Sequence, residues 1–204
     1  MLKLSNKNKS EIAGLILFIA GMILIMGIIA GEIYYPEEYS TRDNEISDLG
    51  ATPPPNSVTY QPSATIFTAT MVFTGIMVLI ASLLLYKEYK NIIISTPIAM
   101  LGIGLLGISI FPASITPWHS AFALITFVAG GFSALTSIKI VRSPLSYVFI
   151  IIALISLILL FLNPFFDPHL GEGGTERFVI YPLIFWMMGF GTYLIGINKA
   201  NELI

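Results

Sequence analysis

The sequence contains no cysteine and few charged residues. The absence of cysteine excludes disulfides, thiolate metal sites and cysteine nucleophiles. Charged residues make up 11% of the 204 residues, about half of the share that a soluble domain carries. With 55% hydrophobic residues and a mean hydropathy of +0.84, the chain has too little polar surface to cover a soluble globule. It is therefore predicted to be a polytopic membrane protein with a single domain, residues 1–204.

Charge is also absent from the interiors of six apolar segments. Each is long enough to cross a bilayer as a helix of about 20 residues, the fifth only just. The segments are residues 12–31, 63–86, 92–111, 118–138, 145–162 and 178–197. They predict an all-α bundle of six transmembrane helices, whose oligomeric state stays open. Gly27 and Gly31 form a GxxxG pair, which we expect to pack within the chain rather than to drive dimerisation.

The basic residues gather on one side of the predicted spans. Eight lie on that side and two, Arg42 and Arg177, on the other. Positively charged loops tend to stay in the cytoplasm, so both termini are expected there, in a multi-pass protein of the cell membrane. The opposite, outer face carries nine of the twelve acidic residues. A cleaved signal peptide is the alternative for the first segment, but its apolar run exceeds the about 7 to 15 residues of a signal core.

The outer connection between the first two spans, residues 32–62, contains the stretch NEISDLGA and shows no helical period. Connections of this length are commonly either functional or disordered. Tyr34, Tyr35, Ile46, Leu49 and Tyr60 can pack against the rim of the bundle. These residues predict that at least the middle of the loop is ordered.

Asp48 lies in this stretch, near the outer ends of three spans. Spans two, four and six begin on the outer face, so the positive ends of their macrodipoles converge there. We expect Asp48 to face one of these N-termini or Arg177, with Gly50 making the turn. The N-termini and Arg177 could instead hold an anionic lipid headgroup or a phosphate. The sequence leaves both alternatives open.

Both histidines, His119 and His169, fall on the outer face together with Asp48. Imidazoles and carboxylates bind zinc-like ions, and an open position for water would give a hydrolase. The spacing matches no metal-ligand motif, which favours structural roles and no cofactor, with a divalent metal ion as the alternative. Ser47, beside Asp48 and with His119 arriving from span four, is a second catalytic candidate, although no GxSxG motif surrounds it.

Short motifs on the outer face occur as a set: ISDLGA after span one, GISIFP and WH around the turn into span four, and GGTERF before span six. This set resembles the domain of unknown function 998 family of six-span prokaryotic membrane proteins. The resemblance implies the six-helix fold and a shared outer-face cluster, with no established activity. The residues of that cluster are Ser47, Asp48, Leu49, Gly50, Phe111, Pro112, His119, Glu176 and Arg177.

A more distant resemblance connects the chain to six-span proteins of lipid-anchor remodelling and to membrane hydrolases related to ceramidases. Those hydrolases rely on several histidines around a metal, whereas this chain has two histidines. The difference weakens any transfer of their chemistry.

Three functions fit these residues. The favoured hypothesis is a non-catalytic membrane protein whose outer face binds a lipid headgroup or another membrane protein, with no nucleic-acid partner. The second is a lipid-active hydrolase or transferase, which requires Asp48, His119 and Arg177 to converge. The third is a transporter or channel, which ranks last because the span interiors lack the ionisable residues that mark ion pathways.

Overall fold

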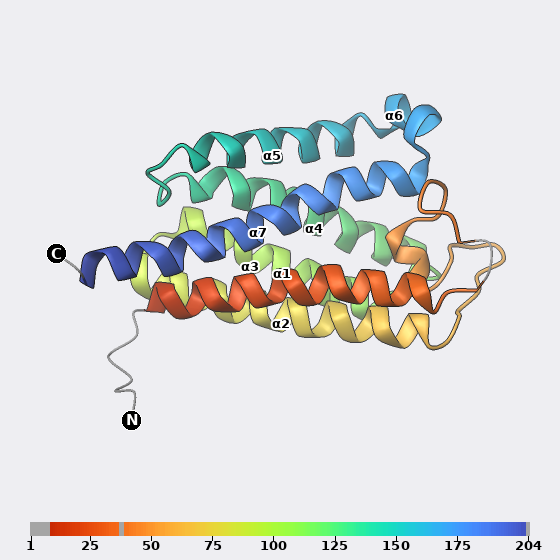
Figure 1. Ribbon diagram of the computed structural model, residues 1–204. Coiled ribbons are helices and arrows are strands. Elements are labelled where there is room, and N and C mark those ends of the chain that lie inside the picture. Colours follow the sequence, from red (N-terminus) through yellow and green to blue (C-terminus); the bar gives the residue numbers. More distant parts are fainter. Residues whose placement is uncertain (1–8, 37–38, 203–204) are drawn as a thin grey trace.

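Long α-helices form at all six segments that the sequence predicts as spans (Figure 1). The computed structural model describes residues 9–36 and 39–202, with side chains as far as residue 197. Within these residues every regular element is helical. The elements are α1 (Lys9–Ile33), the 3-10 helix η1 (Ile46–Leu49), α2 (Ser63–Tyr89), α3 (Ile92–Ile110), α4 (Thr116–Ser137), α5 (Leu145–Phe161), α6 (Asn163–Leu170) and α7 (Glu172–Glu202).

Some charged residues used for the orientation fall outside this description. Lys3, Lys7, Glu37 and Glu38 are not among the described residues, and the side chains of Lys199 and Glu202 are not described either.

The fifth span differs from the prediction at its outer end. The other five long helices are each long and apolar enough to cross a membrane, whereas α5 has 17 residues and therefore reaches only about 26 Å. It passes the same test together with α6, from which it is bent by 91°. The sequence predicts only a connection between two spans here, and its segment NPFFDPHL forms the short helix α6.

The last span also begins earlier than predicted, at Glu172 rather than at residue 178. Gly171 separates α6 from α7 with a φ of 79°, a conformation that glycine adopts without the steric cost of a Cβ. This single residue lets the chain reverse and start the new helix at once. The first turns of α7 therefore carry the GGTERF motif, whose side chains the helix holds in place.

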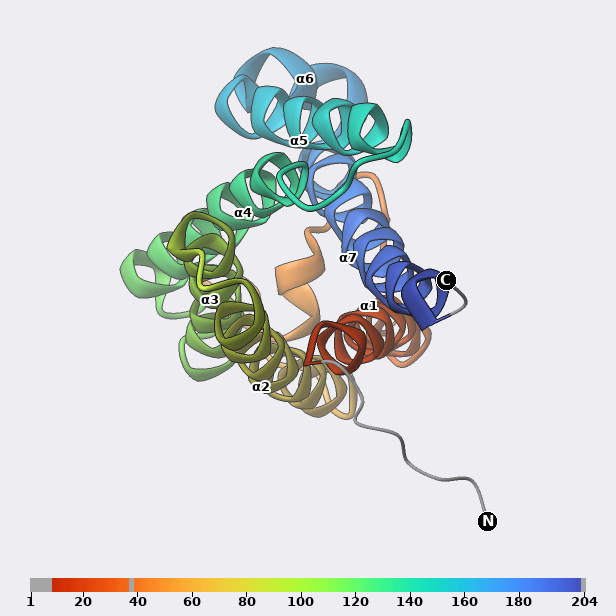
Figure 2. The same ribbon diagram turned by 90° about the vertical axis from the view of Figure 1, so that its left-hand side faces the viewer.

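Five of the six long helices surround the bundle axis, and α5 lies outside them. Viewed along the bundle, α1, α2, α3, α4 and α7 form a ring, and α5 packs on α4 and α7 (Figure 2). Small residues permit close approach between neighbours: a Cβ on Gly14 of α1 would lie 2.5 Å from the carbonyl oxygen of Gly191 of α7. Gly27 faces Thr70 of α2 at similarly short range, and Gly31 faces Leu49. The GxxxG pair thus packs within the chain, as predicted.

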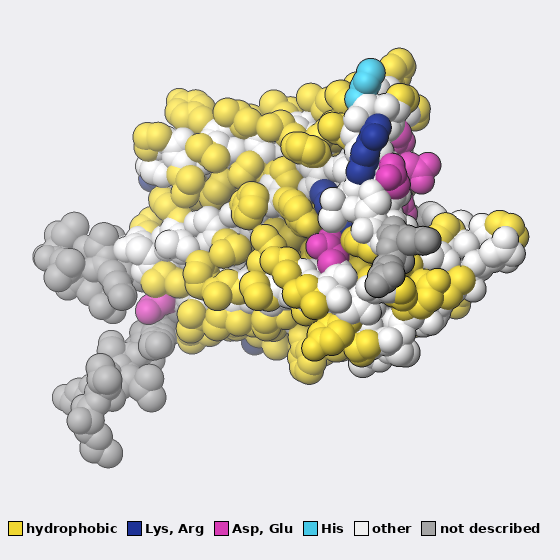
Figure 3. Space-filling view, turned by 45° about the vertical axis from the view of Figure 1, so that its right-hand side comes forward, with side chains coloured by type: hydrophobic (Ala, Val, Ile, Leu, Met, Phe, Trp, Pro, Cys, Tyr) yellow, Lys and Arg dark blue, Asp and Glu magenta, His cyan; other side chains and the backbone are white. Residues whose placement is uncertain are grey.

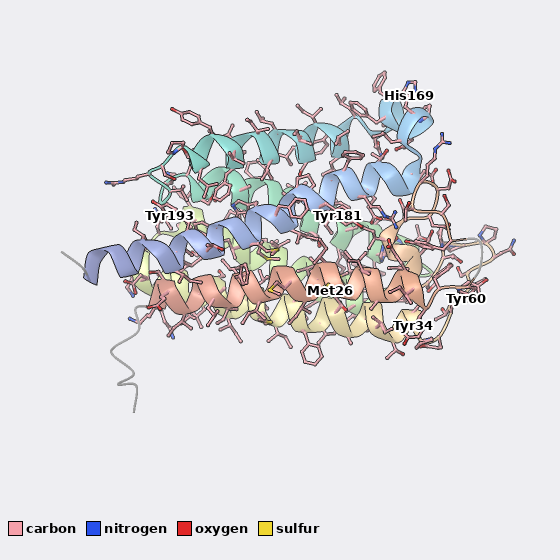
Figure 4. All side chains as sticks on the ribbon, in the orientation of Figure 1. Met26, Tyr34, Tyr60, His169, Tyr181 and Tyr193 are labelled. Atoms are coloured by element: carbon pink, nitrogen blue, oxygen red, sulfur yellow. The ribbon has the colours of Figure 1, made fainter. Side chains whose placement is uncertain are left out.

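Hydrophobic side chains cover the long sides of the bundle, while acidic side chains gather at one end (Figure 3). Phe73 of α2, Tyr147 of α5 and Phe185 of α7 are all more than half exposed, and Met26 of α1 points away from the bundle (Figure 4). Large exposed apolar surfaces of this kind are matched to lipid rather than to water. The acidic end, called the outer end below, holds η1, α6 and the start of α7, while the start of α1 and the end of α7 lie at the opposite end (Figure 1).

Candidate functional site

The ISDL sequence forms η1, which lies in the middle of the ring of helices at its outer end (Figure 2). Ile46 and Leu49 are 2% and 0% exposed. Leu49 packs against Gly31 of α1, and its carbonyl oxygen accepts a hydrogen bond of 3.2 Å from the hydroxyl of Ser63, the first residue of α2. The middle of the outer loop is therefore ordered, as its apolar residues predicted.

Asp48 caps the 3-10 turn in which it lies. Its Oδ2 accepts hydrogen bonds from the backbone N–H of Glu45 at 3.1 Å and from Nδ2 of Asn44 at 3.2 Å. Burial raises the pKa of Asp48, whereas these two bonds and the nearby charges of Arg177 and His119 lower it. The expected cap exists, but it serves η1 instead of a spanning helix, because the turn places the carboxylate over its own N-terminus.

Gly50 follows η1 for a reason other than the one predicted. Its φ of −84° and ψ of −50° are ordinary right-handed values, so the turn does not require glycine for its backbone conformation. A Cβ at this position would instead lie 2.8 Å from Cδ1 of Phe67. The small residue gives α2 room to pack its phenyl ring against the backbone of the loop.

Arg177 joins the first helix, the outer loop and the last helix. Its Nη2 lies 2.7 Å from Oε1 of Glu32, near the end of α1, and 2.5 Å from the hydroxyl of Tyr39. Nη1 donates to three backbone carbonyl oxygens, those of Thr41, Asn44 and Gly173. The sequence left the choice between an internal carboxylate and an external anion open, and the structure gives Arg177 an internal carboxylate.

Glu176, the neighbour of Arg177, makes a second contact between α7 and the outer loop. Its Oε2 accepts a hydrogen bond from the backbone N–H of Ile46, the first residue of η1. Consecutive residues at the start of α7 thus position η1 and the turn that leads into it. Tyr39 adds to the same network, because its hydroxyl donates to the carbonyl oxygen of Glu45 at 3.2 Å.

His119 lies in the first turn of α4 and is 8% exposed. Its Nδ1 is 2.8 Å from the carbonyl oxygen of Phe111, the residue that follows α3. Because a carbonyl oxygen only accepts, Nδ1 carries the hydrogen. In the neutral ring, Nε2 is then the nitrogen that can accept a hydrogen bond or bind a cation.

A cavity of about 630 Å³ opens between α4, the bent pair α5 and α6, α7 and the outer loop. Three of the candidate residues, Ser47, His119 and Glu176, contribute to its lining. The other polar lining residues are Glu45, Ser120, Asn163, Asp167, Glu172 and Thr175, and the remaining lining residues are Pro53, Ala123, Leu124, Phe127, Leu159, Leu160 and Val179. This cavity is called the outer pocket below.

The predicted cluster is therefore divided between two places. Ser47, His119 and Glu176 reach the outer pocket, whereas Arg177 is bound to Glu32 and the loop. The charges of Arg177 and His119 lower the pKa of Asp48, yet the hydrogen bonds described for Asp48 join it to Asn44 and Glu45. The hydrolase hypothesis requires Asp48, His119 and Arg177 to converge. Asp48 lies near enough to the other two for their charges to affect its pKa, but its described hydrogen bonds do not go to either of them.

His169 lies on α6 at the edge of the outer end (Figure 4) and is exposed. Within residues 9–36 and 39–202, no group of three or more His, Asp or Glu side chains could hold a metal ion. The metal site proposed from His119, His169 and Asp48 accordingly stays a prediction.

Residues 18–193 match the family described as Protein of unknown function (DUF998). The match covers more than half of the chain. The chain belongs to this family. All nine residues of the outer-face cluster, from Ser47 to Arg177, fall within the matched DUF998 region. No curated protein and no solved structure matches the chain.

Three residues that build the outer end of this DUF998 protein escaped sequence reasoning: Glu32, Tyr39 and Glu45. Glu45 precedes Asp48 by three residues, the spacing of a capping box, and this spacing is a usable signal. Nothing local distinguishes Glu32 or Tyr39 from other polar residues at a membrane interface. Their partner Arg177 is more than 130 residues away along the chain.

Proposed function

We propose that the outer pocket binds a membrane lipid, with the headgroup at its polar side and part of an apolar chain at its deeper side. The observation that carries this proposal is the division of the lining along the helix axes. On α4 the lining changes from His119 and Ser120 to Leu124 and Phe127, over about 12 Å of helix rise. On α7 it changes from Glu172 and Glu176 to Val179.

The size and position of the pocket suit such a ligand. Its volume falls within the about 300 to 1,000 Å³ that is usual for small-molecule sites. Ser120 and Leu124 are exposed although both contribute to the lining, so one wall of the pocket continues into the lipid-facing surface of α4. A lipid could therefore reach the site without leaving the membrane.

The distribution of basic residues supports a site on the non-cytoplasmic side. Basic residues are concentrated at the end opposite the pocket, and the positive-inside rule assigns that end to the cytoplasm. Lipids of the outer leaflet are then the molecules that meet the pocket first. Binding of a partner protein at the same end is the alternative, and the concave, partly apolar lining favours a lipid.

A lipid-active hydrolase or transferase is the second candidate, because Ser47 and His119 line the same cavity as Glu176. Ser47 Oγ donates to Oε2 of Glu45 at 3.1 Å, so a carboxylate already lies beside the hydroxyl. A water activated by a divalent metal ion near His119 is the other route to this activity. Release of fatty acid or headgroup from labelled lipids by the purified protein, lost in Ser47→Ala or His119→Ala, would move this candidate ahead of simple binding.

Photolabelling tests the lipid proposal. The protein is reconstituted in nanodiscs that contain a diazirine-bearing phospholipid, and the labelled peptides are identified by mass spectrometry. Peptides from α4 and α7 that line the outer pocket should be labelled, and Ser120→Trp should reduce this labelling because the indole fills the mouth. Ala121→Trp is the matched control, since Ala121 is also exposed on α4 but does not line the pocket. Equal labelling in the two variants would contradict the proposal.

A further inference from the structure

We propose that the lipid headgroup held in the outer pocket is cationic, an ammonium or similar amine. This inference rests on the proposed lipid-binding function and specifies its ligand. Four carboxylates line the cavity: those of Glu45, Asp167, Glu172 and Glu176. They come from the outer loop, α6 and α7, so three separate elements converge on one space. Among the residues that the structure describes, no Lys or Arg side chain contributes to the lining.

The two basic residues of the outer face do not neutralise these carboxylates by direct pairing. The salt bridge found within the described part of the chain joins Arg177 to Glu32, and Glu32 does not line the pocket. Both terminal nitrogens of Arg177 are already bonded to groups of α1, α7 and the loop. Arg42 is exposed, and its backbone carbonyl accepts the N–H of Gly174, but its side chain is not part of the lining.

The carboxylates consequently act on one another. Burial raises the pKa of Glu45, the hydrogen bond from Ser47 lowers it, and the charges of Asp48, Glu172 and Asp167 raise it further. Four acidic side chains without a Lys or Arg among the described lining residues leave the cavity with an excess of acidic groups, and repulsion between such groups disfavours their charged forms. A cation that enters this cavity removes the mutual repulsion, whereas an anionic headgroup increases it.

An amine fits the available acceptors better than the other cations do. An ammonium carries three N–H donors and no acceptor, and an ionised carboxylate accepts hydrogen bonds but donates none. A bare metal ion would use the acidic side alone and leave the apolar lining of Leu124, Phe127 and Leu160 without a partner. A primary or methylated amine on an alkyl chain occupies both sides of the pocket at once.

Competition against the photolabel tests the charge of the headgroup. Dodecylammonium, dodecanol and dodecyl phosphate share one chain and differ in charge, and each is added to nanodiscs that contain the protein and the diazirine lipid. Dodecylammonium should displace the label from the pocket peptides at about tenfold lower concentration than the other two, a difference typical of one well-placed charge contact. Glu172→Gln should reduce this preference, because the substitution removes an exposed carboxylate of the lining.

Asp43→Asn is the matched control, since Asp43 is an exposed outer-face carboxylate that does not line the pocket. It should leave the preference for dodecylammonium unchanged. Equal displacement by the three compounds, or the strongest displacement by dodecyl phosphate, would overturn the cationic headgroup and leave lipid binding in place. If the pocket peptides of the unaltered protein take up no label, both proposals fail together.

Discussion

Arg177, near the start of α7, donates a hydrogen bond of 2.7 Å to Glu32, near the end of α1. The two side chains are 8% and 20% exposed, so the ion pair is largely removed from water. It joins the first and the last helix at the outer end and leaves the guanidinium free to bind the loop backbone with its other donors. The pair therefore couples the closure of the helix ring to the order of the loop.

Loss of this arginine should destabilise the protein strongly. Arg177→Ala leaves Glu32 without its partner and removes the hydrogen bonds that Nη1 donates to three carbonyl oxygens, and breaking a buried pair in this way typically costs about 3 to 5 kcal/mol. Thermal unfolding in detergent measures the effect. Arg42→Ala, on an exposed side chain of the same face, should change stability by no more than about 0.5 kcal/mol. Similar losses in both variants would show that the Arg177 network is not the source of stability.

Removal of the η1 cap should have a smaller effect. Asp48→Ala removes the acceptor of the Glu45 N–H and of Asn44. Asp48 is the N3 residue of the capping box whose N-cap is Glu45, and the loss of a cap costs about 1 kcal/mol. Asp48→Asn retains an oxygen in the same place and should lose less. The melting temperatures of the two variants are compared with that of the original protein. A melting temperature unchanged by Asp48→Ala would contradict the capping role.

Space at Gly50 gives a third prediction. Gly50→Ala places a Cβ 2.8 Å from the ring of Phe67, and overpacking of this kind costs about 1 to 3 kcal/mol. The second substitution Phe67→Leu should recover part of the loss. Gly196 of α7 is the control, because a Cβ there meets no atom within 4 Å, and Gly196→Ala should be neutral or stabilising. Equal effects at the two glycines would exclude crowding as the cause.

Stability should fall as the pH rises above the ordinary range of carboxyl groups. Burial is the largest cause of the raised pKa values of Glu45 and Asp48, so the folded protein binds more protons than the unfolded chain between the ordinary and the raised values. Unfolding free energy then decreases with pH across that window, which begins near pH 4. The stabilising contribution of Glu45 and Asp48 to the free energy of unfolding is complete below this pH window and lost above it.

Melting temperatures measured from about pH 4 to pH 8, the range around these carboxyl pKa values, check this dependence. Glu45→Gln cannot ionise and should make the decline less steep. If the melting temperature rises steadily with pH, or if Glu45→Gln leaves the slope unchanged, the burial of Glu45 does not control the pH dependence.

Sequence reasoning was most accurate where the signal is local. Residues 63–86 and 92–111 were predicted as spans and correspond to α2 and α3, because an unbroken apolar run has one stable arrangement in a bilayer. The helical structure at residues 163–170 and 172–177 was not predicted, and the reason is local too. The prolines and glycines of NPFFDPHLGEGG indicate a loop, but prolines are compatible with the first turn of a helix, and Gly171 permits two helices to follow each other directly.

The candidate site was predicted only in part. Ser47, His119 and Glu176 were recognised as outer-face residues, and they do share a cavity. The partner of Arg177 was left open, and the role of Gly50 was assigned to its backbone conformation. Each of these details depends on the distance between elements that are far apart in the sequence, which residue type and spacing do not specify.

The sequence by itself determined the membrane class, the six long helices and the set of polar residues at the outer end. These features follow from the length of each apolar run and from the cost of placing backbone polar groups and charges in lipid, both of which act residue by residue. Only the tertiary structure decided that Arg177 binds Glu32, that η1 lies inside the ring, and that four carboxylates line one cavity. Those relationships arise from the packing of α1, α4, α6 and α7 against the loop, because contact between distant residues is a property of the whole bundle.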